Sequence, residues 1–201
     1  MGTRHIVEVI KDGKKIIRQY GQWDGNAETA GTRIRDFIKN NGKDRLVEIL
    51  KYTEIKNVDS SFKDESDEPD YERLEEIARY IDEVRHPGLY YQGDIDFYLG
   101  IIPAVIDKYG FEDTAYCYMY SRNTGYRILD VINILACHEN CWRTKEYKIP
   151  VYLINEEVDP ERKIIVNLDE DSLTFEYFGR EKSWNFGKLP TIAELKKIDK
   201  W

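Results

Sequence analysis

An Asp-Gly pair at residues 12–13 separates two runs of β-prone residues near the start of the chain. The first run covers residues 5–10 (HIVEVI) and the second covers residues 16–20 (IIRQY). Asp-Gly supplies the two positive φ angles of a tight two-residue turn, and it is the strongest short-range hairpin signal. The sequence therefore predicts a β-hairpin here, which commits this part of the chain to a sheet.

Helical spacing dominates the middle of the chain. Apolar residues recur three and four positions apart, as on one face of a helix, in the segments 34–42, 46–50, 74–81 and 128–135. The most apolar stretch, residues 94–109, contains Gly100 and Pro103. Because proline removes a backbone donor and clashes with the preceding turn, we expect a short helix, a break and a second helix that ends at Gly110.

Strand-like patterns return in the second half. They cover residues 114–120, 149–154, 163–168 and 173–178, and a short helix is expected after Pro190. Strands at both ends with helices between them are typical of the α+β class. We expect a single domain over residues 1–201, in which the N-terminal hairpin and the C-terminal strands form a largely antiparallel sheet with helices packed on it. An acidic loop or insertion is expected around residues 56–70.

The charge balance narrows the range of partners. The chain has 30 basic and 38 acidic side chains and a net charge of −8, with no basic run, so polymeric nucleic acid is a poor partner. No apolar stretch is long enough to span a membrane, and the charged start does not resemble a signal peptide. Three sparse cysteines favour a reducing, cytoplasmic setting. A homo-oligomer is compatible with this composition.

The two ends of the predicted hairpin carry the most unusual group of polar residues. A turn at residues 12–13 would bring Arg4 and His5 beside Gln22, Trp23 and Asp24. Arginine binds carboxylates or phosphates through two hydrogen bonds, and an indole offers a flat surface, so this group would suit a small anionic ligand. The alternative is structural: Arg4 pairs with Asp24, and Trp23 fills the core.

These same segments resemble a known group of proteins. MGTRHI followed by QYGQWDGN is similar to the opening of a family of small, largely uncharacterised phage and bacterial proteins, as are residues 125–132 and 163–178 in later segments. Asn26 and Asn167 depart from that family's pattern. The resemblance implies a phage or prophage context, and therefore the host cytoplasm, where small acidic proteins often bind or block host components.

Two weaker patterns bear on catalysis and metal binding. Cys137, His138 and Cys141 are close in sequence, but a structural zinc site needs four ligands, so ordinary buried thiols are the simpler interpretation. Thr3 would be a candidate nucleophile only if the residues before it were removed, as in N-terminal nucleophile hydrolases. No hydrolase, phosphate-loop or zinc-protease motif occurs, and no cofactor is expected.

Tyrosines provide another candidate for ligand contact. On the strand predicted at residues 114–120, Tyr116, Tyr118 and Tyr120 would share one face, with Arg122 and Arg127 nearby. They could stack a nucleobase and hold its phosphates. The alternative is that they cover a strand face without any ligand.

Three functions are open to this sequence. The leading one is a non-enzymatic, phage-type protein that sequesters a small anionic, nucleotide-like ligand as a counter-defence. The second is an acidic protein-interaction module that inhibits a host factor through the acidic run at residues 64–70. The third is a hydrolase that uses Thr3.

Overall fold

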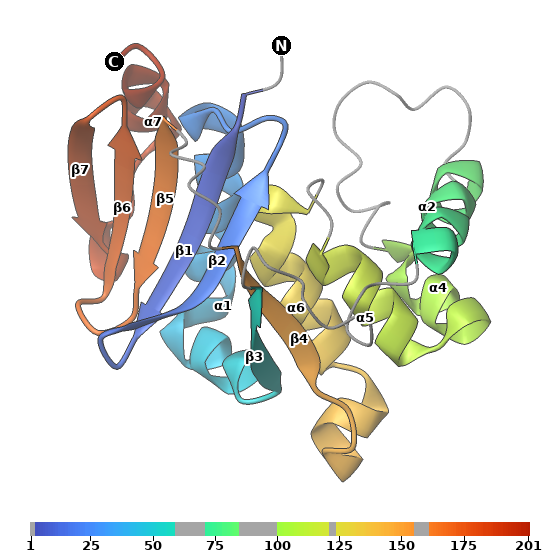
Figure 1. The fold of residues 1–201 in the computed structure, drawn as a ribbon. Helices are drawn as coiled ribbons and strands as arrows, with labels where there is room; N and C mark the ends of the chain where they lie inside the picture. Colours follow the sequence, from blue (N-terminus) through green and yellow to red (C-terminus); the bar gives the residue numbers. More distant parts are fainter. Residues whose placement is uncertain (1–2, 59–70, 85–99, 121–123, 155–160) are drawn as a thin grey trace.

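The computed structural model describes residues 3–58, 71–84, 100–120, 124–154 and 161–201. Its centre is one seven-stranded sheet with the strand order β3-β4-β2-β1-β5-β6-β7. Helices α1, α6 and α7 lie on one face of this sheet (Figure 1). Helix α5 contacts β4, and α2 and α4 pack against α5, further from the centre of the sheet. The predicted α+β class is confirmed.

The strands come from both ends of the chain. They are β1 (His5–Lys11), β2 (Lys14–Gly21), β3 (Thr53–Val58), β4 (Ile149–Ile154), β5 (Arg162–Asn167), β6 (Ser172–Tyr177) and β7 (Arg180–Asn185). The antiparallel ladders β1/β2, β5/β6 and β6/β7 hold most of the paired residues. Parallel pairings of β1 with β5, β2 with β4 and β3 with β4 join them. Strand β1 is therefore the central strand. It lies between β2, which follows it directly in sequence, and β5, which comes from the C-terminal part of the chain.

The helices follow the predicted spacing in most places. They are α1 (Thr32–Leu50), α2 (Tyr71–Val84), α4 (Ile102–Tyr109), α5 (Phe111–Tyr120), α6 (Ile128–Ala136) and α7 (Ile192–Ile198). Gly42 breaks α1 with a φ of 73°, which matches the two helical stripes predicted on either side of it. Thr191 and Glu194 cap the start of α7 reciprocally.

The predicted opening hairpin is confirmed. Asp12 and Gly13 have φ values of 53° and 68°, as a tight turn requires. The same turn is bound by a residue far away in sequence. Both carboxylate oxygens of Asp169, in the β5–β6 turn, accept hydrogen bonds from the backbone amides of Asp12 and Gly13, each at 2.8 Å. The β1–β2 and β5–β6 hairpins are thus joined at their turns.

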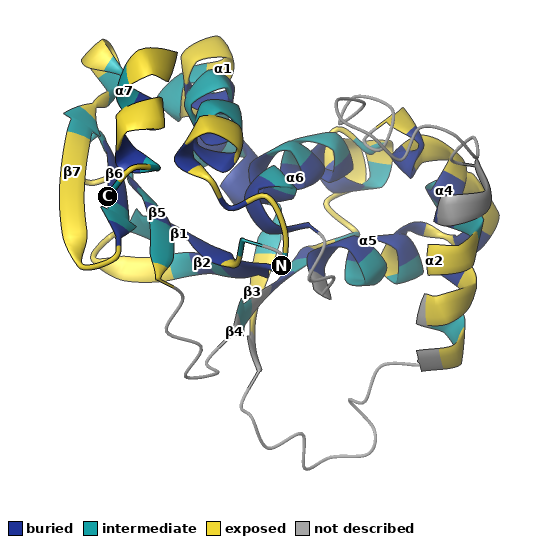
Figure 2. Ribbon diagram, turned by 90° about the horizontal axis from the view of Figure 1, so that it is seen from above, coloured by how far each residue is buried: buried dark blue, intermediate teal, exposed yellow. Residues whose placement is uncertain are grey.

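The core lies between the sheet and its helices. Val7, Val9, Ile164, Val166 and Phe175 point from the central strands into this layer and are fully buried. Figure 2 shows the buried residues along the sheet and on the inner sides of α1 and α6, with exposed residues on the outer side of α1 and only intermediate ones on the outer side of α6. The alternation along the strands explains this arrangement, because successive side chains point to opposite faces.

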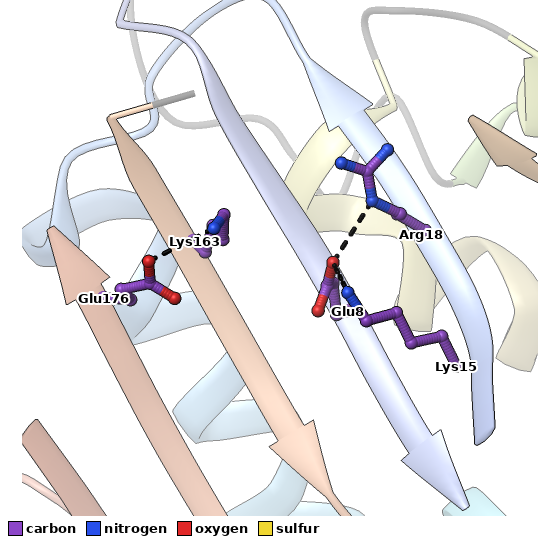
Figure 3. Close-up of polar contacts among 5 residues, drawn as sticks. All are labelled: Glu8, Lys15, Arg18, Lys163 and Glu176. Carbon is purple, nitrogen blue, oxygen red and sulfur yellow. Dashed lines mark hydrogen bonds and ion pairs between the residues drawn. The ribbon is translucent and has the colours of Figure 1, made fainter. Parts of the chain in front are cut away.

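The opposite face of the sheet carries charged cross-strand pairs (Figure 3). Glu8 on β1 accepts hydrogen bonds from Lys15 at 2.8 Å and from Arg18 at 3.2 Å, although its side chain is only 3% exposed. Lys163 and Glu176 form a second pair, across β5 and β6, at 3.1 Å. Both groups lie on directly opposed or adjacent cross-strand positions, where opposite charges stabilise a sheet.

Three expectations about the elements were wrong. Residues 114–120 belong to helix α5 and not to a strand. One face of this helix is buried at helical spacing, through Phe111, Ala115, Tyr118 and Met119. Burial of this apolar face outweighs the β propensity of the tyrosines. Strands β3 and β7 were not expected at all.

Some expectations lie outside the described residues. They concern the acidic segment at residues 59–70 and the first part of the apolar stretch at residues 94–99. Within the parts of the chain that the structure describes, no helix is both long and apolar enough to cross a membrane.

Candidate functional site

The open end of the first hairpin brings the predicted residues together. His5 pairs with Gly21 in the β1/β2 ladder, and the Gly25 amide donates a hydrogen bond of 2.9 Å to the Thr3 carbonyl. Arg4 therefore lies beside the loop that contains Gln22, Trp23 and Asp24. The prediction that these two segments are neighbours is confirmed. We call this region, residues 3–5 and 22–25, the hairpin edge.

Trp23 and Arg4 both face outward at the hairpin edge. The Trp23 side chain is 55% exposed, and Arg4 is exposed as well. Among the described residues, Arg4 forms no ion pair with Asp24 or any other acidic group. The structural alternative, in which Arg4 pairs with Asp24 and Trp23 fills the core, is therefore wrong.

The rest of the loop is held by neighbouring tyrosines. The Tyr20 hydroxyl donates to the Gln22 side-chain oxygen at 2.7 Å, and the Tyr177 hydroxyl donates to the Gly25 carbonyl at 2.7 Å. Asp24 has a φ of 56°, a backbone conformation that aspartate tolerates better than most residues. These contacts fix the backbone on either side of Trp23 and leave its ring at the surface.

Within the hairpin edge, the side chain of His5 lies inside the protein and is fully buried. Three glycines enclose its imidazole. A Cβ atom added to Gly21 would lie 2.1 Å from His5 Cε1, one on Gly25 would lie 2.7 Å from Nδ1, and one on Gly125 would lie 3.0 Å from Nε2. The prediction that His5 contacts a ligand is wrong for a surface ligand, because these backbones cover the ring. His5 supports the site from below.

The imidazole of His5 is held neutral. Burial lowers its pKa to about 4, the backbone of Thr3 opposes this shift, and the positive charges of Arg127 and Arg162 lower the pKa further. Two arginines therefore lie close enough to the hairpin edge to act on a group within it.

The sequence did not point to Arg162, and it suggested Arg127 only as a neighbour of the tyrosines at residues 114–120. Arg162 begins β5, which runs parallel to β1, and Arg127 ends the helical turn Gly125–Arg127, which packs on β1 and β2. Arg127 lies over the ring of its neighbour Tyr126 at 4.9 Å. Burial raises the pKa of Tyr126, with Arg127 opposing and Asp24 adding to the shift. The hairpin edge is thus bordered by positive charge in a chain whose net charge is −8.

The predicted tyrosine face does not exist. On helix α5, residues two apart point to nearly opposite sides, so Tyr116, Tyr118 and Tyr120 cannot line one surface. Tyr118 is 1% exposed and offers no plane for stacking. Arg122 and the side chain of Tyr120 lie outside the described residues.

The cysteines and His138 have structural partners. Cys137 accepts a hydrogen bond from Arg45, and His138 packs against Phe111 and Tyr147. Burial raises the pKa of Cys141 to about 11, which disfavours the thiolate that a metal requires. Over the described ranges, no three His, Cys, Asp or Glu side chains come together as a metal site would need.

The remaining predicted residues are untested. Thr3 lies at the hairpin edge, where its carbonyl is hydrogen bonded to Gly25, and its role as a nucleophile stays a prediction. The acidic run at residues 64–70, which the interaction hypothesis needs, lies outside the described residues.

No protein-family model matches this chain, and no curated protein or solved structure shows significant similarity to it. The resemblance to small phage and bacterial proteins therefore stays a prediction, and the function has to be argued from the site itself.

Proposed function

We propose that this protein binds a small anionic, nucleotide-like ligand at the hairpin edge. The observation that carries this proposal is that an exposed indole, Trp23, lies at the same hairpin end as an exposed arginine, Arg4, which forms no ion pair within the described residues. A single exposed tryptophan is ordinary by itself, but Trp23 lies at the same hairpin end as Arg4 and as His5, on which the charges of Arg127 and Arg162 act.

The chemistry of the edge suits a planar ring joined to a negative group. Stacking of a base on an aromatic side chain contributes about 1–3 kcal/mol, and arginine binds phosphate oxygens through its fork of N–H groups. Arg127 and Arg162 add positive charge at the same place. In the phage context that the resemblance implies, such binding would withdraw a signalling nucleotide from the host.

The test is equilibrium binding of purified protein to adenine and guanine mono-, di- and cyclic nucleotides, by calorimetry and thermal shift. We expect Trp23→Ala and Arg4→Ala to weaken binding by about tenfold each, from the loss of one stacking contact or one charged hydrogen bond. The fold should be unaffected, because both side chains are at the surface.

The chain offers a matched control at a different place. Trp142 is 46% exposed, and the Arg143 guanidinium lies over its ring at 4.5 Å, so this is another exposed tryptophan–arginine pair. Trp142→Ala and Arg143→Ala should bind like the wild type. If no nucleotide binds the wild type, or if both pairs of variants lose affinity equally, the hairpin edge is not a binding site.

A further inference from the structure

The turn between β6 and β7 has an unusual residue in it. Tyr177 pairs with Arg180, so Phe178 and Gly179 form a two-residue turn, with φ values of 52° and 74°. Asparagine or aspartate followed by glycine is the usual choice for this turn, and the first hairpin of the same chain follows that rule with Asp12-Gly13. A bulky side chain at positive φ is strained. Phe178 therefore occupies a position where the turn itself would favour a different residue.

Burial does not compensate for this strain in full. The Phe178 side chain is 44% exposed. Its ring instead carries the guanidinium of Arg162, which lies 4.5 Å from the ring centre, while the ring of Tyr177 is 5.8 Å from the same group. Residues held in unfavourable backbone conformations concentrate at functional sites, so the strain at Phe178 calls for a role in function.

Arg162 itself is positioned to receive an anion. Its Nε atom is shielded from solvent and has no hydrogen-bond partner among the described residues. A buried donor without a partner is costly, and arginine cannot lose its charge to reduce this cost. Arg162 as a whole is only half-buried, so a phosphate oxygen approaching from its exposed side would satisfy this donor once the side chain shifts.

The Arg162–Phe178 pair is linked to the hairpin edge through Tyr177 and through the effect of Arg162 on His5. Tyr177, the neighbour of Phe178, donates its hydroxyl to the carbonyl of Gly25, two residues from Trp23. The acidic groups nearby are Glu161, whose carbonyl accepts a hydrogen bond from the Phe178 amide, Asp199, whose charge acts on Tyr177, and Asp24, the chain neighbour of Gly25. Asp199 is already engaged, because its carboxylate accepts hydrogen bonds from the amides of Ala27 and Glu28 at 2.6 and 2.8 Å.

We propose that Arg162, held flat by Phe178, binds the phosphoryl group of the ligand, while Trp23 stacks its ring. This inference rests on the proposed function and narrows the ligand to a nucleoside phosphate. It predicts that the phosphoryl group and the ring are recognised by different elements, β5–β7 and the first hairpin respectively.

The decisive variant is Phe178→Asn, because asparagine suits the turn better than phenylalanine. We expect it to raise the melting temperature and yet to weaken ADP binding by about tenfold, through loss of the surface that orients Arg162. Arg162→Gln should weaken ADP binding by at least about tenfold. Arg162→Lys, which keeps the charge but not the flat guanidinium, should lose less than Arg162→Gln.

Adenosine and a neighbouring lysine provide the controls. Adenosine lacks the phosphoryl groups, so Phe178→Asn and Arg162→Gln should leave its affinity unchanged, whereas Trp23→Ala should weaken it. Lys163→Gln should bind ADP like the wild type, because Lys163 pairs with Glu176 on the opposite face of the sheet.

Two results would overturn the inference and leave the proposed function intact: ADP binding that depends on Trp23 but not on Arg162 or Phe178, or a Phe178→Asn variant that is less stable than the wild type. If the wild type binds neither ADP nor adenosine, the proposed function fails and the inference fails with it.

Discussion

At the scale of single residues, the clearest feature is a buried carboxylate that serves two cations. Glu8 is 3% exposed and accepts from Lys15 and Arg18, whereas Glu176 on the same face is 38% exposed and, among the described residues, pairs with Lys163. Removing the partners or the charge of a desolvated carboxylate costs much more stability than the same change at a carboxylate that stays hydrated.

We therefore expect Glu8→Gln to destabilise the protein by about 2 kcal/mol and Glu176→Gln by less than about 1 kcal/mol. Urea unfolding of the two variants measures this difference directly. Equal losses for both would mean that burial of Glu8 adds nothing to its ion pairs.

His5 makes the stability depend on pH. Its pKa is about 4 in the folded chain, against an ordinary value of 6.5, so between these values the unfolded chain binds a proton that the folded chain excludes. Stability should be complete above about pH 6.5 and should fall by about 3 kcal/mol as the pH is lowered to about 4.

The comparison that isolates His5 is the pH dependence of unfolding in the wild type and in His5→Leu. Acidic residues contribute to both curves, and only the imidazole contributes to their difference. The two curves should diverge as the pH falls through this window, and parallel curves would show that His5 is not held neutral.

At the scale of elements, the hairpin and the helical turn Gly125–Arg127 pack so closely over His5 that β2 has no room for a side chain at its end. The Cβ atom of an alanine at position 21 would lie 2.1 Å from the imidazole, and Gly125 approaches the Gly21 backbone as well. Neither neighbour can move without disturbing the sheet.

We expect Gly21→Ala to cost about 3 kcal/mol or more, because the core around it is overpacked. Gly100→Ala is the control, since a Cβ atom there would meet nothing within 4 Å. In the double variant His5→Ala/Gly21→Ala the clash is removed, so its loss should be smaller than the sum of the two single losses. Additive losses would argue against the enclosure described here.

Local signals in the sequence decided which elements could be predicted. The first hairpin, α6 and α7 were predictable because Asp12-Gly13, the apolar spacing and the residues around Thr191 are local signals. Helix α5 was not, since its tyrosines alternate like those of a strand while its buried stripe decides the packing. Strand β7 carries almost no apolar pattern, because it is an exposed edge.

The candidate site divides in the same way. Arg4 and Trp23 could be placed together from the turn alone, because a hairpin fixes which residues lie opposite each other. The approach of Arg162 and Phe178 depends on the parallel pairing of β1 with β5, between residues such as Ile6 and Lys163. No local signal in one sequence announces a pairing across so much of the chain.

At the scale of the whole molecule, the two ends of the chain complete one sheet. The central strand β1 lies between β2 and β5. At the end of helix α7, the Asp199 carboxylate accepts hydrogen bonds from two backbone amides of the segment that follows β2. Contacts between distant parts of a chain form slowly, because the loop between them must be ordered first. The final helix therefore belongs to the same folding unit as the first hairpin.

Removal of residues 191–201 should accordingly destabilise the whole protein. Leu195 and Ile198 are buried, and each contributes about 1.5–3 kcal/mol, so the loss should be at least about 3 kcal/mol. Thermal unfolding of the shortened chain measures it, with Lys197→Ala as a surface control. A shortened chain that melts with the wild type would show α7 to be an independent appendage.

The hydrogen bonds from the turn of the first hairpin to Asp169 have a consequence for how the sheet is assembled. Strands β1 and β5 are parallel, and no tight turn joins them, so nothing local determines how far one slides along the other. A slip by a single residue would carry Asp169 away from the amides of Asp12 and Gly13 and would turn every side chain of β5 to the wrong face. The Asp169 carboxylate thus fixes the register between β1 and β5, which no connecting turn determines.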